Sequence, residues 1–334
     1  MNWNIVGHDW AVRLLSEHIA NGRTRQAYLF TGPKGTGRRT LALRFFMALN
    51  CQNPPQPGQF CNSCPACRRI ERMEHPDLDL LQAEQEGGVL IVDQIRGLQR
   101  SLSLSPYEAH YRMGLLLRFE EANFHTANAL LKTLEEPAPH VVLVLTAESA
   151  ESLLPTIVSR CMVLRLGPVA LQTVQESLQT RWELSAEEAT QLAHLSGGRV
   201  GYALKLHQDR EMMDQRKKWL EDLSDLLTSG RVARFDYVEK LDKEKDKERT
   251  RQMLQVWLSL WRDIMLRTAG AAIPVTNLDR AEEIDSLASQ IDLNLAVRTV
   301  NALQRTITYL ESNVNFRLAL EVLALDLPGL ERHN

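Results

Sequence analysis

A glycine-rich loop between a strand pattern and a helix pattern constrains this fold more than any other feature. The apolar run Ala27–Thr31 is typical of a buried strand, Gly32, Gly35 and Gly37 follow it, and Thr40–Asn50 has a helical pattern. Glycines let several backbone N–H groups point at one anion beside a helix N-terminus, which carries partial positive charge. The sequence therefore predicts a phosphate loop; a plain glycine turn is the weaker interpretation, given the strand and helix around it.

Further apolar runs alternate with helical patterns through the first half of the chain, at Met113–Phe119, Val141–Thr146 and Met162–Leu166. Such alternation predicts a mostly parallel sheet covered by helices on both faces. No strand is predicted after Gly167. We expect an α/β domain over residues 1–167, a small helical domain over 168–208 and an all-helical domain over 209–334. The last expected helix, Val314–Leu327, is apolar around most of its circumference and should be buried on several sides.

The loop lacks the side chains that nucleotide hydrolysis requires. A working loop ends in Gly-Lys-Ser/Thr, where the lysine neutralises the β- and γ-phosphates and the hydroxyl holds Mg²⁺. Here Arg38 stands at the lysine position and Arg39 at the hydroxyl position, and Thr40 comes one residue too late. An arginine keeps the charge but not the geometry of a lysine, and Arg39 cannot bind magnesium. The loop is predicted to keep its shape without its catalytic chemistry.

The acidic residues expected at a nucleotide site are also altered. A hydrolase places an Asp, usually with a Glu beside it, at the end of a strand to hold Mg²⁺ and orient water. The stretch Leu115–Glu121 ends in Glu120 and Glu121, with Arg118 before them. The two glutamates are either surviving acids or residues that favour the N-terminus of the next helix through its dipole, and we favour the second interpretation.

Four of the five cysteines are clustered: Cys51, Cys61, Cys64 and Cys67. Two-residue spacings let successive thiolates bind one ion, and four thiolates make a closed, tetrahedral, structural zinc site. The rival is an iron–sulfur cluster, but the further cysteine that usually follows is absent. Four free cysteines without metal are disfavoured by the spacing. The remaining Cys161 is interpreted as a small buried residue.

Composition excludes several classes of protein. The 334 residues are 44% hydrophobic and 24% charged, with a formal net charge of −3. That charge argues against a stand-alone nucleic-acid binder, which needs a basic surface. No apolar run approaches the ~20 residues that span a bilayer, and the first residues lack the pattern of a signal peptide. We therefore expect a cytoplasmic protein without membrane contact.

Several motifs together resemble the AAA+ clamp-loader subunits of bacterial DNA polymerase III, over nearly the whole chain. The matching segments are Ile5–His8, the cysteine segment after the phosphate-loop helix, His75–Asp77, Asn128–Pro137 (Asn-Ala-Leu-Leu-Lys-Thr-Leu-Glu-Glu-Pro) and Ser159-Arg160-Cys161. The resemblance implies an AAA+ α/β domain carrying a zinc module at residues 51–67, a helical lid over 168–208 and a helical collar over 209–334.

In that family the Ser-Arg-Cys motif carries an arginine finger, so the resemblance implies that Arg160 acts on ATP bound to a neighbouring subunit. A guanidinium beside the γ-phosphate offsets the charge that spreads onto the transferred oxygens. The alternative is that Arg160 pairs with a carboxylate of its own chain. Thr146 stands at the family's first phosphate-sensor position, where without phosphate it serves only as a strand-terminal hydroxyl.

Among family members, the chain is more similar to the delta-prime type than to the ATP-hydrolysing gamma/tau type. Gly201 stands where the lid arginine that senses phosphate is expected, in addition to the altered loop and acidic strand. This implies weak or absent ATP binding and no ATPase activity in isolation. The implied partners are the gamma/tau and delta subunits in a pentameric ring, with the sliding clamp and primer-template DNA bound through the complex. The alternatives are an active gamma/tau-type ATPase and an AAA+ scaffold outside replication.

Overall fold

The computed structural model describes residues 3–85, 87–312 and 314–330. The chain divides into two compact units. The first contains the residues up to Ser185 together with Gly198–Tyr202, and the second contains Ala186–Gly197 and the residues from Ala203 onward. Among the described residues, no helix combines the length and apolar character needed to cross a bilayer.

The first unit is built on a five-stranded parallel sheet of order β2-β3-β4-β1-β5. Its strands are β1 (Ala27–Thr31), β2 (Leu78–Leu81), β3 (Arg112–Leu116), β4 (Val141–Ala147) and β5 (Met162–Arg165). The predicted parallel α/β sheet is confirmed. The four-residue edge strand β2 was not predicted, and β3 ends earlier than expected.

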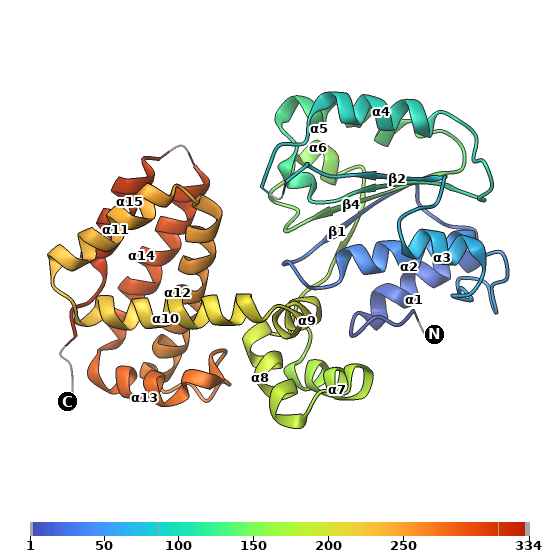
Figure 1. The fold of residues 1–334 in the computed structure, drawn as a ribbon. Helices are drawn as coiled ribbons and strands as arrows, with labels where there is room; N and C mark the ends of the chain where they lie inside the picture. The colour runs from blue at the N-terminus through green and yellow to red at the C-terminus, as the bar shows by residue number, and fades with distance from the viewer. Residues whose placement is uncertain (1–2, 86, 313, 331–334) are drawn as a thin grey trace. The chain divides into compact units, whose positions relative to one another are not determined.

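Helices cover both faces of this sheet (Figure 1). One face carries α1 (Asp9–Ala20), α2 (Arg38–Asn50) and α3 (Pro65–Glu71); the other carries α4 (Val92–Leu102), α5 (Phe124–Glu135) and α6 (Pro155–Val158). Strand β1 shows why both faces are covered. Tyr28 and Phe30 pack in the core with α2, whereas Ala27 and Leu29 pack in the core with α4 and α5. Alternate side chains of one strand thus fill two cores.

Helix α7 (Leu171–Trp182) follows β5 in the first unit, and every later element of regular structure within the described residues is helical. These are α8 (Ala186–Ser196), α9 (Val200–Gln208), α10 (Arg210–Thr228), α11 (Arg231–Glu244), α12 (Lys247–Thr268), α13 (Ala281–Gln290), α14 (Leu293–Glu311) and α15 (Phe316–Asp326), with a short 3-10 turn at Leu278–Arg280. Another 3-10 turn, Phe119–Glu121, lies between β3 and α5. The first residues of α9 belong to the first unit.

The core of the second unit forms around α12, where Met253, Trp257, Leu260, Trp261 and Ile264 are buried. These residues recur at helical spacing and so share one face of the helix.

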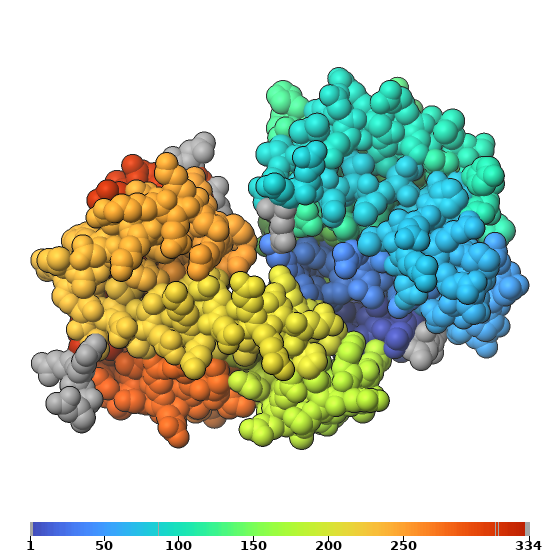
Figure 2. Space-filling view, in the orientation of Figure 1, coloured from blue at the N-terminus to red at the C-terminus, as the bar shows by residue number. Residues whose placement is uncertain are grey.

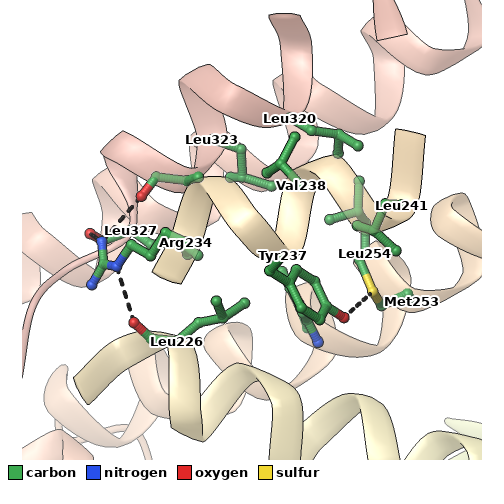
Figure 3. Close-up of a pocket in the computed structure, with 12 residues that line it drawn as sticks. Leu226, Arg234, Tyr237, Val238, Leu241, Met253, Leu254, Leu320, Leu323 and Leu327 are labelled. Carbon is green, nitrogen blue, oxygen red and sulfur yellow. Dashed lines mark hydrogen bonds between the residues drawn. The ribbon is translucent and has the colours of Figure 1, made fainter. Parts of the chain in front are cut away.

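Arg234 is buried beside that core, and no carboxylate of the described residues is bonded to it. Its guanidinium donates to the backbone oxygens of Leu226 and Leu327 (Figure 3) and also to those of Ala324 and Pro328. It therefore caps the C-terminal ends of α10 and α15 at once. The adjoining cavity of ≈ 20 Å³ has room for little more than one water molecule.

Helix α15 departs from the expectation that it is buried on several sides. Ala319, Leu320, Leu323 and Ala324 are buried, but Leu318, Val322 and Leu325 are 55%, 41% and 53% exposed. Their spacing places the exposed leucines and valine on one face of the helix. We call these three residues the α15 apolar face.

Candidate functional site

The phosphate-loop segment runs from Gly32 to Gly37, after β1 and before α2, at the carboxyl end of a parallel strand. Gly35 has φ 88°, and a Cβ there would lie 2.7 Å from the backbone nitrogen of Tyr202. The Gly201 N–H donates to the Gly35 oxygen at 2.8 Å, and a Cβ on Gly201 would lie 3.0 Å from that oxygen. The residue at the expected sensor position thus makes close backbone contact with the loop, which a side chain would disturb.

Arg38 is the first residue of α2 and is only 9% exposed. Burial lowers the pKa of its guanidinium, and the charges of Glu120 and Glu148 act against that change. Its Nη1 is buried without a hydrogen-bond partner among the described residues. Arg39 and Thr40 follow in the first turn and are exposed. The arginine at the lysine position therefore lies in the field of two acids of its own chain.

Glu120 and Glu121, the two acids that follow β3, each lie close to an arginine. Glu121 Oε1 accepts hydrogen bonds from Arg118 Nε at 2.8 Å and from the Gly87 N–H at 2.9 Å. Burial raises the pKa of Glu120, while the nearby Arg38 lowers it. The expectation that these glutamates support the next helix's N-terminus is wrong, because they lie in a separate 3-10 turn and Asn123 caps α5 with its side-chain oxygen.

Two further contacts hold the loop and the strand ends. A ring nitrogen of His8 lies 3.1 Å from the Thr36 backbone oxygen, and burial lowers the pKa of that histidine. The Thr146 hydroxyl accepts a hydrogen bond from the Arg118 N–H at 3.0 Å. Thr146 therefore ties β4 to the residues after β3. His8 entered the sequence argument only as part of a matching segment; nothing local in its sequence points to this contact.

Arg160 lies elsewhere, between α6 and β5, and its side chain is 33% exposed. Its Nε donates to Glu135 Oε1 at 2.9 Å, its Nη2 donates to the same oxygen, and its Nη1 donates to the Thr156 backbone oxygen at 2.9 Å. The Ser159 hydroxyl is 3.5 Å from Nη1, too far for a strong bond. Cys161 was expected to be buried and is only half-buried, although burial raises the pKa of its thiol to about 12.

The cysteines of the predicted metal site come together at the end of α2 and the start of α3. The Sγ atoms of Cys51, Cys61, Cys64 and Cys67 all lie within 4.8 Å of one another. A tetrahedral zinc–thiolate site needs sulfurs roughly 3.8 Å apart, so the cluster fits such an ion. Three sulfurs also accept backbone N–H bonds of 3.3–3.4 Å, which favour thiolates. Figure 2 shows this segment at the surface of the first unit.

Sequence reasoning assigned no role to His75 and Asp77, which the structure places at the base of β2. Asp77 is fully buried and accepts the N–H groups of residues 107–109 and a bond from Arg112. Burial raises the pKa of Asp77, but the three N–H donors together bring it below its usual range. This carboxylate pins the loop between α4 and β3, a structural role that the His-Pro-Asp sequence alone does not reveal.

Both parts of the chain are similar to known proteins. The family described as "DNA polymerase III, delta subunit" matches residues 7–170, and its "C terminal" counterpart matches residues 210–328. DNA polymerase III subunit delta' of Bacillus subtilis is 30% identical over 319 residues, covering 95% of this chain and 94% of the relative. The chain belongs to this delta' family. Membership of this family confirms the role of a clamp-loader subunit that the resemblance implied.

Other relatives are similar over less of the chain. The delta' subunit of Pseudomonas aeruginosa is 34% identical over 221 residues, 66% of this chain and 67% of that protein. The tau subunit of Escherichia coli is 30% identical over 176 residues, 53% of this chain and 27% of that protein. A solved gamma subunit-related protein of Thermotoga maritima is 18% identical with a TM-score of 0.43, covering 95% and 97% of the two chains.

Proposed function

We propose that this delta'-type subunit does not hydrolyse ATP itself and completes the ATP site of a neighbouring clamp-loader subunit with Arg160. The observation that carries the proposal is the contrast between two guanidinium groups. Arg38, in the chain's own loop, is buried near two acids, whereas Arg160 is part-exposed on a segment that its own chain holds in place.

The chain's own loop supports the first half of the proposal. A hydrolytic site needs free acids for Mg²⁺ and open space for phosphates. Here Glu121 is bonded to Arg118, Glu120 lies in the field of Arg38, and the Gly201 backbone contacts the loop. We propose that residual ATP binding at Gly32–Thr40 is weak or absent.

The partners we propose are the gamma/tau and delta subunits in a pentameric ring, with the sliding clamp and primer-template DNA bound through that ring. The relatives named above are subunits of DNA polymerase III. The α15 apolar face supports a contact with another subunit, because exposed residues at helical spacing on a terminal helix offer a continuous surface. We propose that it meets the matching helical domain of a neighbouring subunit.

We further propose three domains, an AAA+ domain over residues 1–167, a helical lid over 168–208 and a helical collar over 209–334.

We also propose that the four clustered cysteines hold one structural zinc ion. A closed Cys₄ site offers no open position for water or substrate, so the metal would fix the chain between α2 and α3 and take no part in ATP chemistry.

The decisive experiment changes Arg160 to Ala in the complex assembled with its cognate gamma/tau and delta subunits. Because a finger stabilises charge only in the transition state, hydrolysis at the adjacent site should slow on the order of 10³ or more. The total rate of a ring with several ATP sites should fall by less. Arg160→Lys should restore little of the lost hydrolysis rate, since the point charge of an ammonium cannot reproduce the planar fork of N–H donors on a guanidinium.

The matched control is Arg165→Ala, which removes a nearby arginine that is 76% exposed and pairs loosely, at 3.7 Å, with Glu151. This variant should assemble and hydrolyse ATP as the unchanged protein does. A purely local role for Arg160 predicts the opposite pattern, with a lower melting temperature, weaker assembly and a normal rate in the complex that still forms. That pattern would overturn the proposal.

A further inference from the structure

Glu135 and Arg160 are 25 positions apart in sequence and meet through the guanidinium. Glu135 is in the last turn of α5, within the Asn128–Pro137 segment, and its Oε1 accepts bonds from both Nε and Nη2 of Arg160. A guanidinium has five N–H donors in a planar fork. Glu135 occupies two of them, along one edge of the plane.

The Thr156 backbone oxygen accepts a third N–H, from Nη1. Two N–H groups then lack a bond shorter than 3.5 Å, one on Nη2 and one on Nη1, which the Ser159 hydroxyl approaches at 3.5 Å. These two nitrogens form the outer edge of the guanidinium, the edge that binds two oxygens of a phosphate at once. The side chain is 33% exposed, so part of it is accessible to a partner.

The pair contributes little to folding, because both side chains are part-exposed, 33% for Arg160 and 47% for Glu135. Its consequence is orientation. A long arginine side chain otherwise samples many rotamers, and ordering them at each catalytic event has a cost in free energy. A carboxylate that fixes the plane beforehand removes that cost.

We infer that Glu135 is a positioning residue, which holds the Arg160 plane so that its two remaining N–H groups face the phosphate of a neighbouring subunit's ATP. This inference rests on the proposed role of Arg160. It names the residue on which the finger's geometry depends and assigns a function to the first glutamate of the Glu-Glu-Pro sequence at the end of α5.

The test uses the complex assembled with its cognate subunits, with single-turnover ATP hydrolysis measured in the presence of clamp and primed DNA. Glu135→Ala should slow hydrolysis at the adjacent site by about tenfold through restored rotamer freedom, with the apparent ATP affinity unchanged. Glu135→Gln should stay within about threefold of the unchanged protein, because both bonds go to a single oxygen, which an amide also offers. The melting temperature should move by no more than about 2 °C in either variant.

Glu136→Ala is the matched control, since it removes the neighbouring charge, and the described contacts include no ion pair or side-chain hydrogen bond for Glu136. It should hydrolyse ATP at the unchanged rate. The double variant Glu135→Ala with Arg160→Ala should be no slower than Arg160→Ala alone, because Glu135 acts only through the arginine.

Three results would overturn the inference: an unchanged rate in Glu135→Ala beside a slow Arg160→Ala, a faster rate in Glu135→Ala, or additive losses in the double variant. Each of these leaves the proposed role of Arg160 intact. An unchanged rate in Arg160→Ala itself would remove the proposed function first and this inference with it.

Discussion

Arg38 and Arg160 place the same guanidinium group in two different environments of one unit. Arg38 is 9% exposed and lies in the field of Glu120 and Glu148, so the chain itself supplies its counter-charges. The Arg160 side chain is 33% exposed; Glu135 accepts from one edge of its guanidinium, and the Thr156 backbone oxygen accepts from Nη1. A buried arginine surrounded by acids serves its own fold, whereas an oriented, part-exposed one offers donors to another molecule. The proposed function uses this difference, because it assigns Arg160 to a neighbouring subunit's ATP and gives Arg38 no part in hydrolysis.

The largest effect we expect in the isolated chain comes from removing the metal. Helix α2 begins at Arg38, beside the phosphate loop, and ends just before Cys51 of the cysteine cluster. The cluster and the loop are therefore joined by one helix, whereas Arg160 lies outside that helix. Purified without chelator, the protein should contain about one zinc per chain. Stripping the ion should lower hydrogen-exchange protection in residues 51–71 by about 100-fold, since local structure there depends on it.

The segment around Arg160, residues 155–165, should keep its exchange protection when the metal is removed, because its strand pairs within the sheet. Iron with sulfide in the purified protein, or no metal at all, would contradict the site. Equal loss of protection in both segments would show that the two regions are not independent.

A smaller effect should follow from Gly201→Ala. The added Cβ would meet the Gly35 oxygen at 3.0 Å, so the contact that covers the loop must open. Chemical denaturation should show a loss of about 1–3 kcal/mol, as for other overpacked sites. The control is Gly97→Ala in α4, where a Cβ meets nothing within 4 Å and helix propensity should add about 0.5–1 kcal/mol. If Gly201→Ala is as stable as the unchanged chain, the loop is not closed by that contact.

The smallest effect is expected from restoring the side chains that the phosphate loop lacks. Arg38→Lys combined with Arg39→Thr restores the lysine and the hydroxyl residue of a working phosphate loop. The isolated chain should still show no ATP turnover above background. This variant leaves Gly201 unchanged, and it also leaves Glu121, which accepts the Gly87 N–H, and the half-buried Glu120 in place. Calorimetry with Mg²⁺-ATP and a turnover assay check both properties. Robust hydrolysis by the unmodified chain would instead favour the gamma/tau type.

Local patterns in the sequence predicted the parts of the site that depend on neighbouring residues. The glycine spacing gave the loop between β1 and α2, and the cysteine spacing predicted a cluster whose sulfurs do lie together. The apolar run at 141–146 predicted β4, which is buried throughout. Each of these features is encoded within about twenty residues, so periodicity and spacing suffice to find it.

Other features depend on contacts that no local pattern records. Strand β2 was missed because it has four residues, at the edge of the sheet, and most of them are only half-buried. Glu120 and Glu121 were misplaced because the sequence does not show that β3 ends at Leu116 or that Arg118, with φ 50°, leads into a 3-10 turn. The pair between Arg160 and Glu135 joins two segments through tertiary packing alone.

The central claim is that this chain serves ATP hydrolysis through Arg160 and not through its own loop. It is tested most directly by comparing Arg38→Ala and Arg160→Ala in the same assembled complex, with assembly and clamp-dependent ATP hydrolysis measured on each. Arg38→Ala should leave the rate of the assembled complex within about twofold, whereas Arg160→Ala should slow its adjacent site on the order of 10³ or more. Normal hydrolysis with Arg160→Ala, or a comparable loss with Arg38→Ala, would contradict the account.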